Sequence, residues 1–136
     1  MTREILFKAK RLDNGEWASG SLVCFAGGER AILPSDSKAF FSNKGFICCD
    51  TCHDVDPATV CEYTGLTDKN GKKIFEGDIL SYNGSREPVI FNIDLRIPCF
   101  TTGIGSGSST PLHPYKLSKR HFVIGNIHDG EGGQHE

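Results

Sequence analysis

The sequence predicts a mainly β fold that is built from hairpins and contains little helix, and three observations support this. Sixteen glycines and one methionine among 136 residues indicate many tight turns and few long helices. Several short segments alternate apolar and polar residues, which is the period of a half-buried strand. Pairs such as Asn14-Gly15 separate these segments and favour tight turns.

The first two predicted strands form a hairpin. The apolar side of the first segment contains Ile5, Phe7 and Ala9. Asn14-Gly15 follows and favours a type I′ turn, because both residues tolerate positive φ. The second arm runs from Trp17 to Phe25. The basic residues around the end of the first arm are interpreted as its solvent-facing side: Lys8, Lys10 and Arg11.

The next third of the chain, residues 26–56, shows no clear hydrophobic period. Within it, residues 31–34 ("AILP") predict a short strand, and Pro34 to Ser37 predict a turn. Residues 58–63 ("ATVCEY") predict another short strand.

The segment from Tyr63 to Leu80 is dense in turn residues and charges. In "DKNG", Asp68 occupies the first turn position, where its carboxylate accepts a backbone N–H, and Gly71 occupies the last, where a left-handed residue is favoured. Residues 76–78 predict a second bend before a strand over 79–82. Each polar residue therefore has a conformational purpose, and we interpret the segment as scaffold and not as an active-site loop.

The C-terminal part contains the most regular alternation in the chain. In residues 88–99, one predicted strand face contains Val89, Phe91, Ile93, Leu95, Ile97 and Cys99. Residues 101–110 are rich in Gly, Ser and Thr and predict a flexible connector. Residues 121–127 ("HFVIGNI") are apolar on both faces and predict a buried strand.

Length and composition predict a single domain over residues 1–128, followed by a flexible tail over 129–136. The formal net charge of −2, with interspersed signs, gives no broad basic face, so we predict no binding to duplex nucleic acid. No apolar run approaches the roughly 20 residues of a membrane-spanning helix, and the N-terminus lacks the apolar core of a signal peptide. These features predict a cytoplasmic protein without a membrane partner.

Three segments together resemble the YopX family of phage and prophage proteins: "REILFKAKRLDNGEW", "YTGLTDKNGKKIFEGDIL" and "VIGNIHD". The resemblance implies a small, strongly bent sheet or an SH3-like, partly open barrel. It leaves residues 26–56 and 98–120 as variable loops or insertions. It supplies no catalytic residues.

Cysteines provide the strongest chemical signal. Cys49 and Cys52 form a C-x-x-C pair, His53 is adjacent, and Cys61 follows at a distance that a loop can close. Zinc accepts such ligands, but His53 directly abuts Cys52 and makes an imperfect second half of a site. We therefore predict that the protein needs no cofactor, with a structural zinc ion as the alternative.

No catalytic pattern accompanies the cysteines. The five histidines form no H-E-x-x-H arrangement, and the sequence contains no G-x-S-x-G elbow. The alternating glycines at 103, 105 and 107 lack the following Lys-Ser/Thr of a phosphate loop. We predict that the protein is not an enzyme and assign no catalytic residues.

The predicted function is that of a phage- or prophage-encoded accessory protein that binds a host protein or a small ligand, with homo-oligomerisation and an anti-defence role left open. The alternative is a factor associated with single-stranded nucleic acid during replication or packaging, because small bent β-barrels bind single strands through aromatic and basic residues. The candidate partner surface for this chemistry contains Phe40, Phe41 and Lys44.

Overall fold

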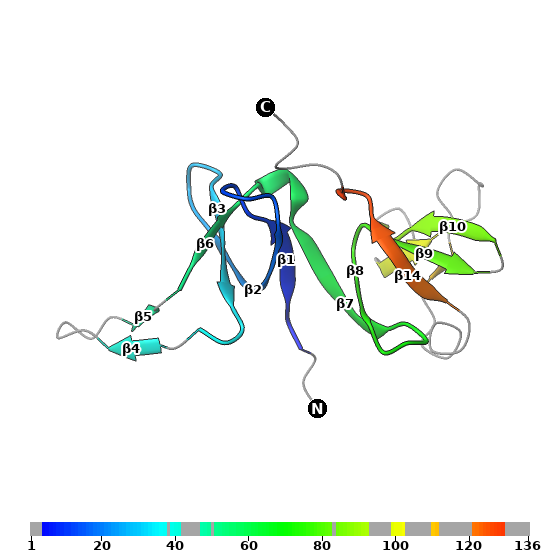
Figure 1. Ribbon diagram of the computed structural model, residues 1–136, viewed down its shortest axis with the longest axis horizontal. Coiled ribbons are helices and arrows are strands. Elements are labelled where there is room, and N and C mark those ends of the chain that lie inside the picture. The colour runs from blue at the N-terminus through cyan, green and yellow to red at the C-terminus, as the bar shows by residue number, and fades with distance from the viewer. Residues whose placement is uncertain are drawn as a thin grey trace. The chain divides into compact units, whose positions relative to one another are not determined.

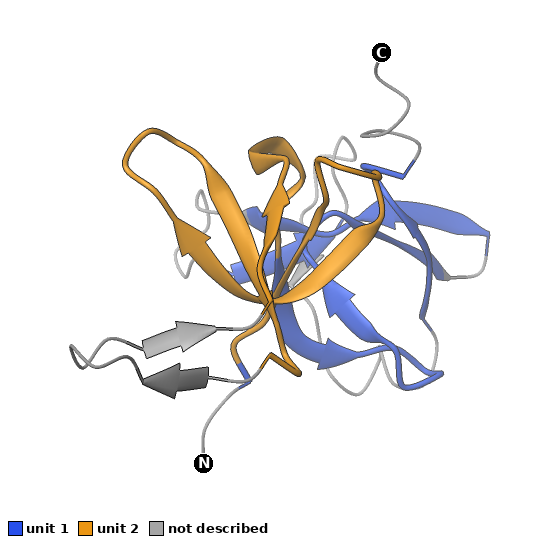
Figure 2. Cartoon of the chain, turned by 60° about the vertical axis from the view of Figure 1, so that its left-hand side comes forward, with its two compact units in different colours: residues 1–4, 62–129 blue, residues 5–61, 130–136 orange. Residues whose placement is uncertain are grey.

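The structure, a computed structural model, describes residues 4–37, 39–41, 47–49, 51–82, 84–92, 99–102, 110–111 and 121–129. The chain gathers into two compact units: unit 1 comprises residues 1–4 and 62–129, and unit 2 comprises residues 5–61 and 130–136 (Figure 2). The described residues form antiparallel strands and one short 3-10 helix, which confirms the mainly β prediction. The single domain predicted for residues 1–128 stays a prediction.

Strand bounds follow the order of the chain in Figure 1. Unit 2 contains β1 (Phe7–Lys10), β2 (Trp17–Cys24), β3 (Arg30–Pro34), β4 (Ala39–Phe41), β5 (Ile47–Cys49), β6 (His53–Val55), the 3-10 helix η1 (Pro57–Thr59) and the first residue of β7 (Cys61–Thr67). Unit 1 contains the rest of β7, β8 (Lys73–Phe75), β9 (Asp78–Tyr82), β10 (Ser85–Pro88), β11 (Ile90–Asn92), β12 (Cys99–Thr102), β13 (Thr110–Pro111) and β14 (Phe122–Asn126).

The sheet of unit 2 bends strongly. Its strand order is β6-β3-β2-β1, and each neighbouring pair is antiparallel. An isolated bridge also joins Arg11 to Val55, and the Leu12 N–H donates to the Asp54 carbonyl oxygen at 3.0 Å. Strand β6 therefore lies along β3 and beside the end of β1, in agreement with the predicted bent sheet.

A small apolar core fills the bend of unit 2. Its buried members are Ala9, Ala18, Ile32 and Val55, and Phe7, Leu22 and Val60 pack against them. Two expectations for the first arm are wrong. Ile5 precedes β1 and is 68% exposed, so it does not join the core side. Lys10 is only 6% exposed, because its cross-strand partner Trp17 covers it.

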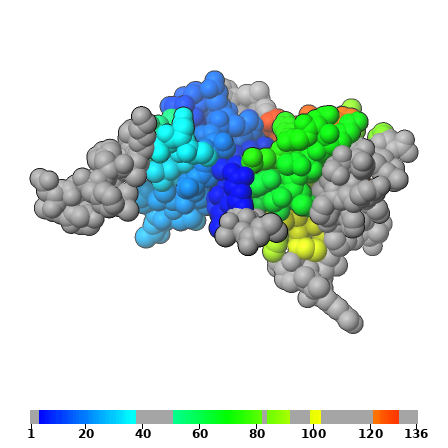
Figure 3. All heavy atoms as spheres, turned by 90° about the horizontal axis from the view of Figure 1, so that it is seen from below, coloured from blue at the N-terminus to red at the C-terminus, as the bar shows by residue number. Residues whose placement is uncertain are grey.

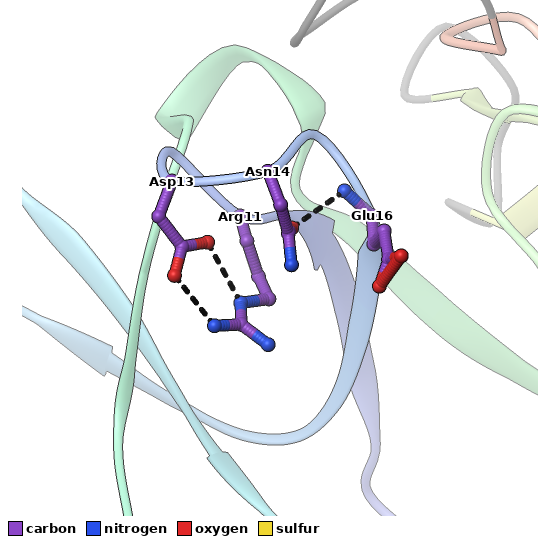
Figure 4. Close-up of polar contacts among 4 residues, drawn as sticks. All are labelled: Arg11, Asp13, Asn14 and Glu16. Carbon is purple, nitrogen blue, oxygen red and sulfur yellow. Dashed lines mark hydrogen bonds and ion pairs between the residues drawn. The ribbon is translucent and has the colours of Figure 1, made fainter.

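The hairpin of β1 and β2 is confirmed, but its turn is longer than predicted. Lys10 pairs with Trp17 at the end of the ladder, and the Arg11 N–H donates to the Glu16 carbonyl oxygen at 2.8 Å. The loop between Arg11 and Glu16 therefore contains four residues, 12–15. Asn14 does not begin a two-residue type I′ turn. Its side-chain oxygen instead accepts the Glu16 N–H at 2.9 Å (Figure 4), while Gly15 adopts a φ of 72°.

Residues 26–56 contribute structure to unit 2. Phe25 to Glu29 connect β2 to β3, and the N–H of Gly28, at a φ of 97°, donates to the Phe25 carbonyl oxygen. Strand β3 contains the predicted "AILP" segment, and the Ser37 N–H donates to the Pro34 carbonyl oxygen as the predicted turn requires. Strands β4 and β5 pair as a further hairpin.

Unit 1 has a separate core of Ile74, Leu80 and Val89, against which Leu66, Phe100 and Val123 pack. Its strands include two three-stranded sheets, β10-β9-β14 and β11-β12-β13. The strand predicted to run unbroken from Val89 is interrupted. Val89 is buried and exchanges backbone hydrogen bonds with the 77–78 bend, whereas Phe91 is 43% exposed. Residues 93–98 lie outside the described part.

The strand predicted at 121–127 is present as β14, but it is not buried on both faces. Ile124 is 43% exposed, and the register of β14 with β9 shifts between Val123 and Gly125. A bulge of this kind turns a side chain out of the alternation. Of the predicted tail, only Asp129 is among the described residues.

Candidate functional site

The predicted turn at Asp68 is confirmed and is fastened to a distant strand. One Asp68 carboxylate oxygen accepts the N–H groups of Asn70 and Lys72, each at 2.9 Å. The other accepts the Val123 N–H of β14 at 2.8 Å, and Asp68 is only 3% exposed. Gly71 closes the turn at a φ of 80°. The carboxylate is thus committed to backbone donors.

Asp78 is the centre of a second buried polar network. Its carboxylate is fully buried and accepts the Phe75 N–H and the Asn126 side-chain amide, both at 2.8 Å. Asp129 in turn accepts the Asn126 N–H at 2.8 Å. Asp78 belongs to the "EGDIL" part of the second resembling segment, and Asn126 and Asp129 belong to the "GNIHD" part of the third. Their polar chemistry maintains the fold, since buried polar groups require partners.

Glu76 lies beside this network at the second bend. Burial raises the pKa of the Glu76 carboxyl above its usual value of 4.5, and the nearby charge of Glu62 raises it further. The Phe91 backbone N–H and the charge of His128 act in the opposite direction on that pKa.

A separate cavity of about 220 Å³ in unit 1 is lined by Leu80, Ser85, Glu87, Thr102 and His121.

Unit 2 contains two adjoining cavities of about 380 Å³ each, which we call the turn crevice. The first is lined by Leu12, Gly27, Gly28, Glu29, Arg30, Asp54, Val55 and Pro57. The second is lined by Arg11, Leu12, Asp13, Cys52, His53 and Asp54. The two share Leu12 and Asp54. The crevice exists because the bent sheet brings the turns at both ends of β2 to the end of β6.

Both arginines that line the crevice donate hydrogen bonds to residues of the turns beside them. Arg11 donates from Nε and Nη2 to the two carboxylate oxygens of Asp13, at 2.9 and 2.5 Å (Figure 4). This hydrogen bonding lowers the pKa of the Asp13 carboxyl. Arg30 donates from Nη1 to the carbonyl oxygens of Glu29, at 2.9 Å, and Phe25, at 3.5 Å. The guanidinium groups therefore stabilise the walls.

Of the predicted zinc ligands, Cys52 and His53 lie together in the second cavity. Cys61 is buried, and its thiol donates to the Thr59 carbonyl oxygen at 3.3 Å. Cys49 belongs to β5, and its side chain lies outside the described part. Among the described residues, no three His, Cys, Asp or Glu side chains gather as a metal site.

The predicted partner surface falls largely outside the described residues. Phe40 and Phe41 belong to β4, where their backbones pair with Cys48 and Ile47, but their side chains and Lys44 are not described. No motif in the sequence marks Leu12 or Glu29 as a binding residue. The Gly27-Gly28 pair between two apolar runs was the available signal for the second turn of the crevice.

Comparison with known protein families shows which family the chain belongs to. The YopX protein family profile matches residues 6–131. The chain belongs to the YopX family. The match extends through residues 26–56 and 98–120, which the three resembling segments do not include. No curated protein matches this YopX-family chain.

A solved structure shares the fold of this chain. The crystal structure of protein EF1440 from Enterococcus faecalis aligns with a TM-score of 0.63 at 22% sequence identity. The alignment covers 95% of this chain and 96% of that chain, so the likeness concerns the whole fold. In the part of the chain that the structure describes, no helix is long and apolar enough to cross a membrane.

Proposed function

We propose that this YopX-family chain is a phage- or prophage-encoded accessory protein that acts by binding and not by catalysis. Its partner is a protein or a small ligand in the cytoplasm of a bacterial host, and interference with host defence is the form of this function that suits a phage protein. The observation that carries the proposal is that the polar residues of the recognisable motifs are hydrogen-bonded within the fold, whereas the turn crevice is open to a partner.

The polar side chains of the resembling segments are engaged in the fold. The carboxylate oxygens of Asp68 and Asp78 accept hydrogen bonds from backbone N–H groups and from a side-chain amide. Groups held in this way are poorly suited to accept protons from a substrate. By contrast, the turn crevice opens at hairpin turns, where binding residues are commonly carried by a rigid sheet.

Binding to single-stranded nucleic acid is the second candidate, because cations lie over aromatic rings in both units. Lys8 Nζ and Lys10 Nζ lie 4.7 and 5.4 Å from the centre of the Trp17 ring. Lys69 Nζ lies 4.7 Å from the Phe122 ring centre. Strands β1, β2 and β3 also present a continuous surface, blue to cyan in Figure 3. Aromatic and basic side chains together provide stacking and charge for single strands.

The test uses the full chain as bait in a lysate of a bacterial host, alongside labelled single-stranded DNA and a panel of nucleotide signals. We expect a stoichiometric complex with a host protein from the lysate or with a nucleotide signal. We expect no turnover of any added substrate. Selective binding to single-stranded DNA, lost in Trp17→Ala, would favour the second candidate. Substrate turnover that a single Asp or His substitution abolishes would refute the binding function.

A further inference from the structure

We propose that the turn crevice binds a segment of a partner protein in which an apolar side chain lies next to a lysine or arginine. This inference rests on the proposed binding function and specifies its site and the chemistry of its partner.

The first cavity offers an apolar surface. Its lining includes Val55, which is buried, and Pro57, which begins η1. Leu12 lines both cavities and is 66% exposed although it is large and apolar. An apolar side chain from a partner would remove the Leu12 side chain from water, and burial of such area favours association.

Two carboxylates of the crevice, those of Glu29 and Asp54, can accept a cation. Three carboxylates, from Asp13, Glu29 and Asp54, line it together with the guanidinium groups of Arg11 and Arg30 and the imidazole of His53. Arg11 pairs with Asp13, and Arg30 bonds to backbone carbonyl oxygens. No described side chain donates a hydrogen bond to Glu29 or Asp54. A lysine or arginine of the partner would supply the missing donors.

Gly27 helps to place one of these carboxylates. A Cβ atom at Gly27 would come within 2.6 Å of Glu29 Oε1, so the missing side chain leaves room for the carboxylate over the turn. Asp54 stands on β6 and lines both cavities. The position of the anionic groups is therefore built into the turn and the strand.

The shape of the crevice favours a chain segment over a compact small molecule. Its two cavities adjoin at Leu12 and Asp54, and each is near the lower end of the range for small-ligand pockets. Two neighbouring side chains of one extended segment can occupy the two cavities and place the shared Leu12 between them. Recognition of this kind uses pockets for side chains at fixed spacing.

The experiment selects peptides from a random displayed library against the immobilised full chain. The expected result is enrichment of peptides that carry Lys or Arg beside a large apolar residue. The affinity of the best peptide is then measured for the wild type, for Leu12→Ser and for Glu29→Gln combined with Asp54→Asn. All three positions are exposed, so these variants should keep the circular dichroism spectrum of the wild type.

Matched controls are Glu16→Gln, an exposed carboxylate outside the crevice, and Ile127→Ser, an exposed apolar residue of unit 1. We expect the crevice variants to bind about tenfold more weakly or worse, and the controls to bind as the wild type does. Amide resonances of Leu12, Gly28 and Asp54 should shift when the peptide is added.

Enrichment of acidic or purely polar peptides, a lack of any enrichment, or unchanged affinity in the crevice variants would overturn the inference. The proposed function has a separate outcome. A host partner that binds the crevice variants as well as the wild type would leave the binding function in place and move its site elsewhere. The absence of any host partner or ligand for the wild type would count against the function itself.

Discussion

The two units of this YopX-family chain use polar residues in opposite ways. In unit 1, the buried carboxylates of Asp68 and Asp78 accept hydrogen bonds from residues that are far apart in the sequence: Asp68 from the Val123 N–H, and Asp78 from the Asn126 side-chain amide. In unit 2, the carboxylates of Glu29 and Asp54 are exposed beside a crevice, and the buried interior is mainly apolar. Recognisable motifs thus coincide with the scaffold, while the candidate binding residues lie on hairpin turns and on strand β6.

This contrast has a physical basis. A buried carboxylate with several fixed donors tolerates few replacements, because any change leaves those donors unsatisfied. An exposed turn residue faces no such requirement and can change with the partner. A motif in a small β protein therefore marks positions that folding constrains, and it need not mark the positions that act.

The largest effect on stability is expected for Asp78→Ala. The substitution leaves the Phe75 N–H and the Asn126 amide without their acceptor in a buried site, so the free energy of unfolding should fall by about 3 kcal/mol or more. Denaturant titration measures this loss. Asp54→Ala removes an exposed carboxylate and should change the same quantity by less than about 0.5 kcal/mol. Equal losses of unfolding free energy in the two variants would contradict the proposed difference between the units.

Gly20→Ala should be the most harmful glycine substitution in unit 2. Gly20 has a φ of 154°, and a Cβ atom there would clash with the Leu33 backbone oxygen of the neighbouring strand. Backbone must move to relieve this clash, so we expect a loss of about 2–3 kcal/mol. Gly71→Ala, at a φ of 80° with open space around the Cβ, should cost about 1–2 kcal/mol from backbone strain alone. Thermal unfolding that ranks the pair in reverse would show that the β2–β3 pairing is wrong.

A smaller, pH-dependent effect is expected for Glu76→Gln. Burial raises the folded-state pKa of Glu76 above 4.5, so the folded protein holds this proton more tightly than the unfolded chain. The stability that protonation contributes is present at low pH and is lost as the pH rises from 4.5 through the raised pKa. The glutamine variant avoids this loss and should be more stable than the wild type at pH 7, by less than about 1 kcal/mol because solvent screens a half-buried group.

Denaturant titrations of both proteins between pH 3.5 and about 8 check this sign, and the difference should shrink below pH 4.5. A variant that is less stable than the wild type at pH 7 but equal to it at low pH would mean that Glu76 contributes favourably as a carboxylate.

The smallest effect is expected at the cysteines. Cys52→Ser should leave the melting temperature unchanged, because Cys52 is exposed and folding is predicted to need no metal. Protein purified without added metal should contain well below one zinc ion per chain by elemental analysis. Near-stoichiometric zinc that disappears together with folded structure in Cys52→Ser would establish the alternative of a structural metal site.

Local turn chemistry could be predicted from the sequence, and longer-range packing could not. The Asp68 turn follows from position-specific rules that act over four residues, and the structure confirms it. The burial of Lys10 depends on Trp17 as its cross-strand partner, and the exposure of Ile124 depends on a bulge against β9. The alternation around Val89 was misleading, because the chain changes its partner at this residue: β10 pairs with β9, whereas β11 pairs with β12.

The candidate site was missed for the same reason. Leu12 and Asp54 are 42 positions apart, and they meet only because the sheet of unit 2 bends until β6 reaches the end of β1. No local pattern encodes that meeting. The Gly27-Gly28 pair marked one turn of the crevice, but nothing near it in the sequence indicated which other turn would lie beside it.

The central claim, that motifs hold the fold and the turns of unit 2 bind, is tested most directly by measuring stability and peptide affinity on the same two variants. Glu29→Gln combined with Asp54→Asn should unfold as the wild type does and lose binding by about tenfold or more. Asp78→Asn should be clearly less stable but should bind as the wild type does when it is assayed well below its melting temperature. The reverse pattern, with lost binding in folded Asp78→Asn and full binding in the crevice variant, would contradict the account.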